Sequence, residues 1–483
     1  MVLKVLVLCL LCSAFADVLA ALPASVLATE AQGCCNALDN ELHRVIRPGT
    51  QYDAANVRWS VTAMLHPTCI AQPTDTAEVA QAVKILTAAA CPFAVKSGGH
   101  TPTPGANDIN HGVTVDLRYI NQTTLSADRG SVTLGVGSTW LNAYTNLNDT
   151  GVAFPGGRYG LVGVGGITLG GGLSFFSPKV GWVADNVVEF EVVLASGEVV
   201  NASSASHSDL FRALKGGSGN FGIVTRVEIR TFVSDGRVWG GSVAYPCTDN
   251  TTGLVLSAVN NFTTNNHLDQ DAAFNSNFIY NTTTGTKEIA NTLFYAKDVA
   301  DRPIFNEAQS IQPQLANTAA STTIVELAAD TASLPYGYRY LGATVTFKNT
   351  LKALTTAQRI TDAVFQTVSN VTDLQFTFVY EPIPRLYTQH SLAQGGNVLG
   401  LDDTVEDLIS AFASWAGQME EAMSSIGAYE RFTYLNYAAS SQNPLASYGD
   451  ANVRFLEHVA TRYDPEGVFQ TLVPGGFKIS KVG

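Results

Sequence analysis

The chain has 483 residues, which is too long for one ordinary domain, so two or three domains are expected. Apolar residues make up 46% of the chain and charged residues 14%, a composition that favours large cores over disorder. The formal net charge is -13 and no basic run is present, which argues against nucleic acid or an anionic membrane surface as a general partner.

The first twenty residues have the pattern of a secretory signal peptide. Lys4 precedes a short apolar run, and Val18 and Ala20 supply the small residues typical of a cleavage site. This run is too short to cross a membrane, and no later stretch of the sequence has the unbroken apolar length of a transmembrane helix. We therefore expect residues 1–20 to be removed and the mature protein to be exported.

Two further features of the sequence agree with export. Four cysteines are expected to form disulfides in an oxidising compartment, with the adjacent Cys34 and Cys35 bonding to two distant partners rather than to each other. The other two are Cys69 and Cys91, in a pairing that the sequence leaves open, and Cys247 remains as the odd thiol. Seven Asn-x-Ser/Thr triplets predict glycans in a eukaryotic host, at Asn121, Asn148, Asn201, Asn250, Asn261, Asn281 and Asn370.

The first half of the chain predicts an α+β unit of short strands and glycine turns. Residues 74–91 predict a helix capped by Asp75, because apolar residues recur along one helical face. A second, shorter helix is predicted at 208–216. Alternating apolar residues predict half-buried strands, and a Ser-Gly turn joins two more; the predicted strands are 92–97, 112–120, 132–140, 187–195, 198–200 and 221–232.

Beyond about residue 235 the glycine runs thin out and the pattern changes. Strands are predicted at 342–348 and 374–382, and helices at 356–368 and 405–426. This pattern indicates a second domain, 235–428, in which helices cover one antiparallel sheet. A helix at 450–463, stopped by Asp464-Pro465, is predicted in the last segment, 429–483.

Three glycine loops carry the chemical signal, at 98–99, 163–172 and 216–222. The third contains a formal Gly-x-Gly-x-x-Gly, but it follows a helix and opens a strand, whereas a Rossmann fingerprint follows a strand and opens a helix. Exposed backbone N–H groups in such loops can form nests for phosphate oxygens. Convergence of all three loops on one elongated anionic cofactor would explain them together.

The ordered motifs resemble a known flavoprotein family. They are "PTDTAEVAQAVKI", "FAVKSGGH", "GVGGITLGGG", "DNVVEFEVVLASGEVV", "DLFRALKGGSGNFGIVT" and the terminal "YLNYA", and they cover nearly the whole mature chain. This set is similar to the berberine-bridge-enzyme-like oxidases of the vanillyl-alcohol-oxidase and p-cresol-methylhydroxylase superfamily, of the fungal secreted kind. The resemblance implies an α+β fold, with a two-lobed FAD-binding domain of the p-cresol-methylhydroxylase type at 34–234, an α+β substrate domain at 235–428, and a segment at 429–483 that returns to the FAD domain.

The resemblance also implies a covalent flavin. In the family the histidine after the two glycines is bonded to the 8α-methyl group of FAD, and His100 matches it. The backbone of Ser97, Gly98, Gly99 and Thr101 in the same loop would approach the pyrophosphate. Gly165, Gly166 and Gly170 of the second loop would line the cofactor. The more loosely assigned Asn186, Gly222 and Val224 would lie along its adenosine and ribityl side.

Three departures from the family pattern modify this expectation. Many members attach the flavin a second time through a cysteine, and Tyr159 stands at that position, so a single bond through His100 is expected. Leu173 stands where plant relatives have a tyrosine that assists the base. Val162 occupies the family's oxygen-gate position, where a small residue accompanies oxidase behaviour.

The catalytic candidates lie near the C-terminus. In the "YLNY" run, Tyr434 is the expected base for the substrate hydroxyl, with Asn436 and Tyr437 against the flavin. A tyrosine titrates near pH 10, so this role needs a lowered pKa from a cation or hydrogen-bond donors. Glu381 is a second base candidate, and a surface or strand-end glutamate is the alternative reading of it.

The sequence therefore predicts a secreted, FAD-linked oxidase that acts on a small alcohol, sugar or specialised metabolite, without a metal ion. Its expected partners are the substrate and dioxygen, and we expect a monomer. The alternatives that remain are a dehydrogenase with another electron acceptor and a catalytically idle flavin-fold glycoprotein.

Overall fold

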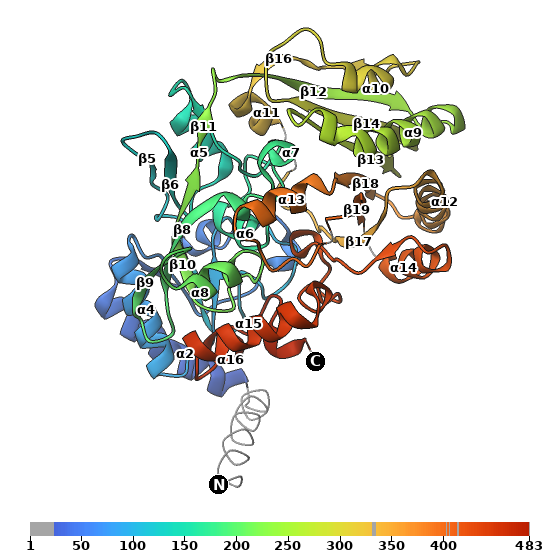
Figure 1. The fold of residues 1–483 in the computed structure, drawn as a ribbon. Coiled ribbons are helices and arrows are strands. Elements are labelled where there is room, and N and C mark those ends of the chain that lie inside the picture. The colour runs from blue at the N-terminus through green and yellow to red at the C-terminus, as the bar shows by residue number, and fades with distance from the viewer. Residues whose placement is uncertain (1–23, 331–334, 402, 405, 413–414, 483) are drawn as a thin grey trace.

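The structure is a computed structural model that describes residues 24–330, 335–401, 403–404, 406–412 and 415–482. The predicted signal peptide, residues 1–20, lies outside the described residues. Two lobes are visible in Figure 1, each with its own hydrophobic core. No described helix combines the length and apolar character needed to cross a membrane.

The first lobe holds two sheets. The first sheet has the order β1-β2-β4-β3, in which β2, β4 and β3 are parallel. The second is antiparallel in the order β5-β6-β10-β8-β9. Their strands are β1 (Val45–Ile46), β2 (Cys69–Ala71), β3 (Phe93–Lys96), β4 (Val113–Asp116), β5 (Thr123–Leu125), β6 (Ser131–Gly135), β8 (Val187–Val193), β9 (Val199–Ser203) and β10 (Ile223–Arg230), and a separate pair is formed by β7 (Val152–Ala153) and β11 (Phe232–Val233).

Helices pack around these sheets, and the two helices predicted for this lobe, at 74–91 and 208–216, are present as α4 and α8. Asp75 caps α4 by accepting a hydrogen bond from the backbone N–H of Glu78, as the sequence predicts. The predicted hairpin between β8 and β9 is confirmed. The expectation of a half-buried strand at Val113–Asp116 was wrong: β4 is buried on both faces, because it lies in the middle of a parallel sheet. The helices of this lobe are α2 (Ala24–Glu41), α3 (Tyr52–Ala55), α4 (Thr76–Ala88), α5 (Trp140–Leu147), α6 (Val164–Leu169), α7 (Ser177–Val180) and α8 (Ser208–Leu214).

Two disulfides fasten α2 to the first sheet. Cys34 bonds to Cys91, and Cys35 bonds to Cys69 at the start of β2. Their Cα atoms are 6.5 and 6.1 Å apart. The expectation that the two adjacent cysteines have distant partners is confirmed, and Cys247 is a free, half-buried thiol.

The second lobe is one antiparallel sheet of nine described strands, covered on one face by α9, α12 and α14 (Figure 1). Apolar residues of those helices and of the sheet form the second core. The strands are β12 (Arg237–Pro246), β13 (Ala272–Asn281), β14 (Thr286–Tyr295), β15 (Ala316–Asn317), β16 (Ala320–Thr323), β17 (Ala343–Lys348), β18 (Gln375–Ile383), β19 (Asp407–Phe412) and β20 (Tyr429–Glu430), and the helices are α9 (Asp249–Asn265), α10 (Asn306–Ser310), α11 (Ile324–Asp330), α12 (Leu351–Val368), α13 (Leu386–Ala393) and α14 (Ala416–Ser425).

One predicted helix in this lobe was wrong in its first half. Residues 407–412 form strand β19, and only 416–425 are helical. β19 pairs with β18 on one side and β17 on the other, so its backbone is hydrogen-bonded by neighbours that the local sequence does not reveal. Burial in the middle of the sheet therefore overrides the helical pattern.

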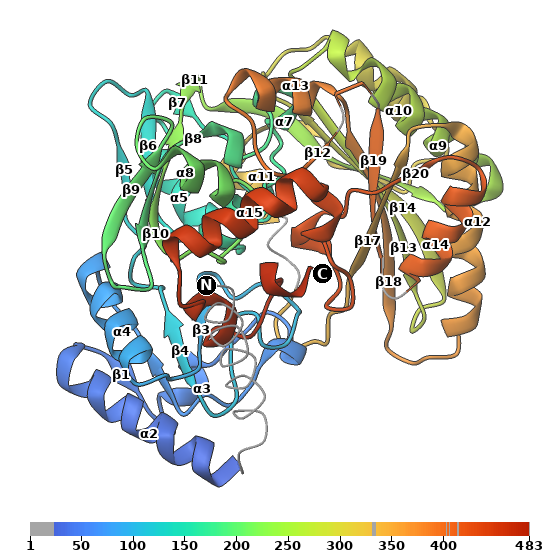
Figure 2. The same cartoon turned by 60° about the horizontal axis from the view of Figure 1, so that its bottom comes forward.

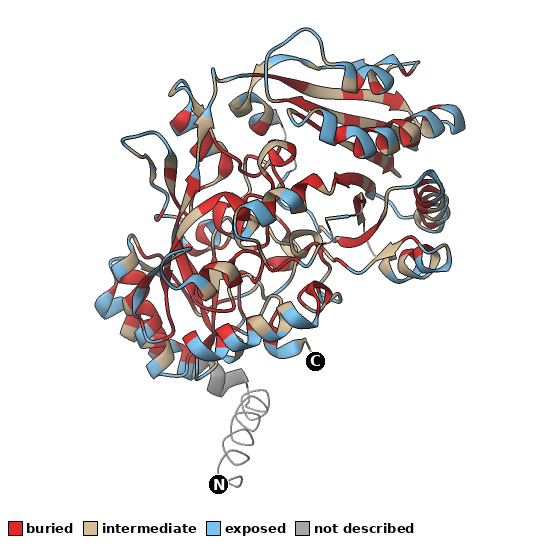
Figure 3. Cartoon of the chain, viewed as in Figure 1, coloured by how far each residue is buried: buried red, intermediate tan, exposed pale blue. Residues whose placement is uncertain are grey.

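The C-terminal segment crosses back to the first lobe. Helix α15 (Asp450–Tyr463) lies beside α8 (Figure 2), and Arg212 of α8 donates a hydrogen bond to Asn452. The helix ends before Asp464-Pro465, as predicted. Asp464 then accepts hydrogen bonds from the first backbone N–H groups of α16 (Val468–Thr471). Figure 3 shows the buried residues concentrated in the interior of this lobe, where segments distant in sequence meet.

Candidate active site

The His100 loop begins directly after β3 and touches the second glycine loop. A side chain on Gly98 would place its Cβ 2.5 Å from the Cα of Gly163, so the two backbones can approach this closely only without side chains. Gly99 has a φ of +69°, a conformation that favours glycine. Ser97 joins the same two loops: its hydroxyl donates to the carbonyl of Val136 and accepts from the N–H of Gly165. The glycine pattern thus builds one continuous surface from two segments.

Aromatic rings surround the side chain of His100. Trp59 stacks on it with ring centroids 4.1 Å apart, and Tyr340 stacks on the other face of Trp59 at 3.7 Å. The ring of Tyr159 is tilted against His100 at 5.7 Å. Burial lowers the pKa of His100 to about 4, so the imidazole is neutral near pH 7. Its Nε2 atom is buried and has no hydrogen-bond partner.

The second and third loops meet at α6. The N–H of Ser218, in the third loop, donates to the carbonyl of Leu169 in α6. Gly170, at the end of α6, leaves room for Asn436, whose Cγ would lie 2.7 Å from a Cβ at that position. Gly166 is exposed and has open space where a side chain would project. The three glycine loops therefore converge, as the sequence predicts.

The looser predicted positions have local partners of their own. Asn186 donates to the carbonyls of Val180 and Trp182, and the hydroxyl of Thr101 accepts from the N–H of Thr103. Gly222 fits against Val192 and Val193 of β8, and Val224 is buried in β10, whereas Val162 is half-buried beside the second loop. These contacts explain the residues as structural elements, and their roles toward a cofactor stay predictions.

A buried ion pair joins the two lobes beside this surface. Arg158 donates to Oε1 of Glu381 in β18 at 2.8 Å and to the hydroxyl of Tyr437 at 2.9 Å. The side chains of Arg158 and Glu381 are only 16% and 5% exposed. Burial opposes the charge on Arg158, but the carboxylate of Glu381 outweighs it and raises the arginine's pKa. Oε2 of Glu381 is buried without a hydrogen-bond partner.

Tyr434 lies behind this cluster rather than within it. Its hydroxyl accepts hydrogen bonds from the backbone N–H of Leu173 and from Nδ2 of Asn436, and its ring contacts Tyr437 at 4.8 Å. Tyr434 is 1% exposed. Burial raises the pKa of Tyr434 despite these donors, so the lowered pKa that the sequence reasoning required is not found in the protein alone.

Comparison with known proteins identifies the family to which the chain belongs. Residues 67–203 match the FAD binding domain family. The chain is 37% identical to an FAD-dependent monooxygenase of Emericella nidulans, over 94% of this chain and 100% of that one, and 35% identical to one of Aspergillus calidoustus, over 88% and 85%. The chain belongs to the family of FAD-dependent oxidoreductases that these fungal relatives represent.

Solved structures share the fold. A chitooligosaccharide oxidase has a TM-score of 0.73 at 20% identity, covering 92% of this chain and 98% of that one. The 6-hydroxy-D-nicotine oxidase of Arthrobacter nicotinovorans has a TM-score of 0.71 at 20% identity, covering 89% and 96%. A glucooligosaccharide oxidase of Acremonium strictum with a 6-S-cysteinyl, 8α-N1-histidyl FAD has a TM-score of 0.71 at 20% identity, covering 92% and 98%. The p-cresol-methylhydroxylase-type fold predicted from the sequence is thereby confirmed.

The residues of this chain fit FAD. The glycine loops give close backbone access and open space at Gly166, which suits an extended cofactor. Three buried polar atoms of the site have no hydrogen-bond partner, namely Nε2 of His100, Nε1 of Trp59 and Oε2 of Glu381. A bound polar cofactor and its substrate would supply the missing partners.

Sequence reasoning missed three residues of this site, namely Arg158, Trp59 and Tyr340. Arg158 could have been noticed, because it is a lone charge in the glycine-rich stretch 156–172. The two aromatic residues carry no such signal, since they come from loops 281 residues apart that meet only through the fold.

Proposed function

We propose that this FAD-dependent oxidoreductase is a secreted oxidase that takes a hydride from an alcohol, sugar or specialised metabolite and gives hydrogen peroxide. Bound FAD would supply the hydride acceptor and the route of the two electrons to dioxygen. In this proposal residues 34–234 and 429–483 hold the cofactor, residues 235–428 hold the substrate, and the protein acts as a monomer. The observation that carries it is the buried contact of Arg158 with Glu381 and Tyr437, beside the loop of His100.

His100 is proposed to hold the cofactor through one covalent bond. Its neutral imidazole keeps a lone pair available for bonding to the 8α-carbon, which a protonated ring lacks. The stack with Trp59 fixes the plane of the ring. Tyr159 stands where a cysteine makes the second bond in some relatives, so a single bond is expected.

Glu381 is the proton acceptor that the geometry favours. Tyr437 is the second candidate: burial raises its pKa, as it does for Tyr434, but Arg158 opposes that effect through a direct hydrogen bond, and the role requires the phenolate. Arg158 donates to the tyrosine oxygen, so the phenolic hydrogen of Tyr437 is directed away from the arginine. The same arginine binds one carboxylate oxygen of Glu381 and leaves Oε2 without a partner. A substrate hydroxyl that donates to Oε2 would be held where its proton can be taken as the hydride leaves. Tyr434 remains the alternative base.

A second function is favoured by the names of the relatives. Several chains at 32–37% identity are called FAD-dependent monooxygenases, and such enzymes insert one atom of dioxygen into their product. An oxidase instead returns both oxygen atoms as hydrogen peroxide. The fate of the two oxygen atoms therefore distinguishes the two functions.

The test is a substrate panel of alcohols, sugars and phenolic metabolites under ¹⁸O₂. The oxidase proposal expects flavin reduction without oxygen, one peroxide per product after oxygen is admitted, and no ¹⁸O in the product. Incorporation of ¹⁸O into the product would contradict the oxidase proposal and identify the protein as a monooxygenase. Reduction that only an artificial acceptor reverses would make the protein a dehydrogenase, and a panel that never reduces the flavin would favour the idle glycoprotein.

A further inference from the structure

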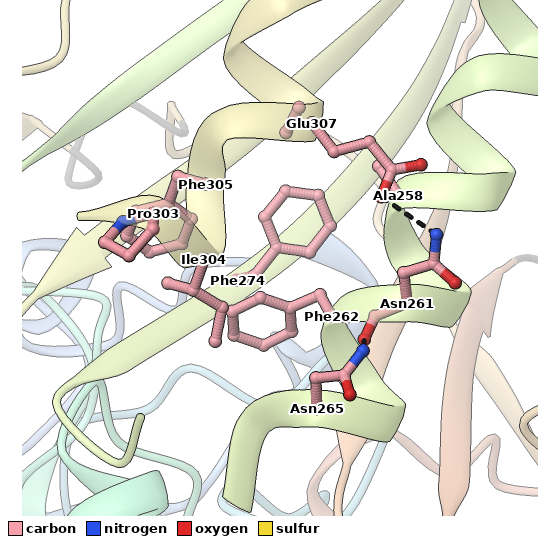
Figure 4. A pocket seen from close by; sticks show the side chains of 10 residues that line it. Ala258, Asn261, Phe262, Asn265, Phe274, Pro303, Ile304, Phe305 and Glu307 are labelled. Carbon is pink, nitrogen blue, oxygen red and sulfur yellow. Dashed lines mark hydrogen bonds between the residues drawn. The ribbon is translucent and has the colours of Figure 1, made fainter. Parts of the chain in front are cut away.

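A surface pocket of the second lobe lies apart from the candidate active site. It encloses about 210 Å³ between α9 and the turn of 303–305 that precedes α10 (Figure 4). Three almost fully buried aromatic side chains lie beneath it as an apolar floor: Phe262 lies parallel to Phe305 at 5.9 Å and against Phe274 at 5.2 Å. Pro303 and Ile304 form its apolar wall at the surface. None of the residues that contact His100 or Glu381 lines it.

Polar side chains from α9 and α10 lie at the rim of the pocket. Asn261 donates through Nδ2 to Oε2 of Glu307 at 2.9 Å, and Asn265 donates to the carbonyl of Asn261 at 2.8 Å (Figure 4). Asn261 and Glu307 are exposed. The pocket therefore offers an apolar wall beside hydrogen-bonding groups, as small-molecule sites do. Its volume is below the roughly 300–1,000 Å³ of sites for drug-sized ligands, which suits a single small ring.

The chemistry of a monosaccharide matches both sides. The C–H face of a pyranose is apolar and can pack on apolar side chains such as those of Pro303 and Ile304, whereas its hydroxyl and acetamido groups need hydrogen-bond partners. Asn261 is also the first residue of an Asn-Phe-Thr triplet, the acceptor sequence for N-glycosylation. The residue that would carry the sugar thus lines the pocket that the sugar would fill.

We propose that Asn261 carries an N-linked glycan whose first N-acetylhexosamine occupies this pocket. The inference rests on the secretory route proposed above. In the transfer, Nδ2 of Asn261 bonds to C1 of a sugar delivered by a lipid-diphosphate-linked oligosaccharide. The C1–O bond to the diphosphate breaks, the amide loses one proton, and the lipid diphosphate leaves. One amide hydrogen remains, so the donor to Glu307 is preserved.

Folding follows the transfer, because Thr263 of the triplet is fully buried and bonded to the carbonyl of Val259. Once α9 forms, the first sugar lies against Pro303 and Ile304 and the rest of the glycan extends into solvent. The bond between sugar and asparagine is then shielded. Asn250 provides a comparison, since it starts a triplet in the first turn of the same helix and lines no part of this pocket.

The experiment uses the whole protein secreted from a eukaryotic host. Mass spectrometry measures glycan occupancy at each triplet, and a peptide-N-glycosidase that cuts the sugar–asparagine bond is applied to native and denatured protein. We expect release at Asn261 to be at least tenfold slower in native than in denatured protein. At Asn250 and the other occupied sites the two rates should be close. Ile304→Ala, which removes half-exposed apolar wall, should speed native release at Asn261 alone.

The outcomes separate this inference from its premise. Glycans at other triplets with none at Asn261 would contradict the inference about the pocket but would agree with the secretory route. Equal release rates from native and denatured protein at Asn261 would have the same meaning. Slow release that Ile304→Ala does not change would also overturn it, because the shielding would come from elsewhere. A secreted chain without any glycan would overturn it as well, whereas a chain that is not exported would overturn the route and the inference together. Flavin reduction by substrate, measured on the same protein, tests the redox proposal independently.

Discussion

Replacing Arg158 by methionine removes the buried cation that joins the two lobes. The change keeps most of the side-chain volume and leaves Glu381, 5% exposed, without its ionic partner. Breaking one side of a buried pair is destabilising by about 3–5 kcal/mol, because the remaining charge is neither solvated nor paired. The hydroxyl of Tyr437 loses its donor in the same variant. We therefore expect Arg158→Met to lose several kcal/mol of stability and most of its rate of flavin reduction.

A double-mutant cycle of Arg158→Met and Glu381→Gln measures the coupling free energy between the two side chains. The two groups lie 2.8 Å apart, so their effects should be non-additive, with a coupling of about 1–3 kcal/mol. The double variant should be more stable than the sum of the single changes predicts. Arg158→Lys keeps the charge but has no planar fork to reach both partners, and it should recover stability more than activity.

The assay is denaturant unfolding of the flavin-loaded enzyme, followed by flavin and tryptophan signals, beside anaerobic stopped-flow reduction. A coupling below about 0.5 kcal/mol would show that the two side chains do not interact in solution and would refute the argument. Full activity in Arg158→Met would remove this contact from the proposed mechanism even if stability falls.

Three further predictions concern the flavin surface. Denatured wild-type protein should keep its yellow colour on the polypeptide and His100→Ala should not, and free FAD in acid-precipitated wild type would contradict the bond. Because burial lowers the pKa of His100 to about 4, formation of the bond in flavin-free protein mixed with FAD should proceed from pH 8 to about pH 5 and fail below pH 4, whereas a bond already formed should survive acid. Val162→Leu should slow reoxidation of the flavin by oxygen and leave reduction of the flavin by substrate nearly unchanged in stopped-flow traces. An unchanged rate of reoxidation would contradict the oxygen-gate role of Val162. Gly163→Ala should destabilise the chain, because its Cβ meets the backbone of Gly98, whereas Gly166→Ala meets nothing and should lower only the FAD content, read from absorbance; equal losses of stability would contradict the loop geometry.

The sequence predicts those parts of the fold whose signals are local. The Asp75 cap and the helix 450–463 are examples, because capping and apolar periodicity depend only on neighbouring residues. The same reasoning failed at 407–412, where pairing with two strands decides the conformation. Strand β4 shows the related error in burial, since β2 and β3 pair only with its edges, and both of its faces are buried by packing on the two sides of the sheet that the local sequence does not reveal.

The candidate site divides in the same way. The glycine loops could be found because close backbone approach leaves its mark on residue type, and their order identifies the family. The pairing of Glu381 with Arg158 could not be found, because the two residues lie 223 residues apart in the sequence and no local pattern links them. The choice among Tyr434, Tyr437 and Glu381 depends on which side-chain oxygen faces the arginine, and that is set by the path of the chain between the lobes.

The two tyrosines of the "YLNY" run should therefore respond differently to loss of a hydroxyl group. In Tyr434→Phe the backbone N–H of Leu173 loses its acceptor in a buried environment, which should lower stability by about 1–3 kcal/mol with a smaller effect on flavin reduction. In Tyr437→Phe the stability should change less, because Arg158 keeps its contact with Glu381, while loss of a proton acceptor should slow reduction by about 10²–10⁴-fold. Thermal unfolding and anaerobic stopped-flow absorbance measure the two effects on the same preparations. If Tyr434→Phe is the variant that cannot reduce its flavin while Tyr437→Phe reduces at the wild-type rate, then Tyr434 is the base despite its burial, and the arginine contact serves only to hold the lobes together.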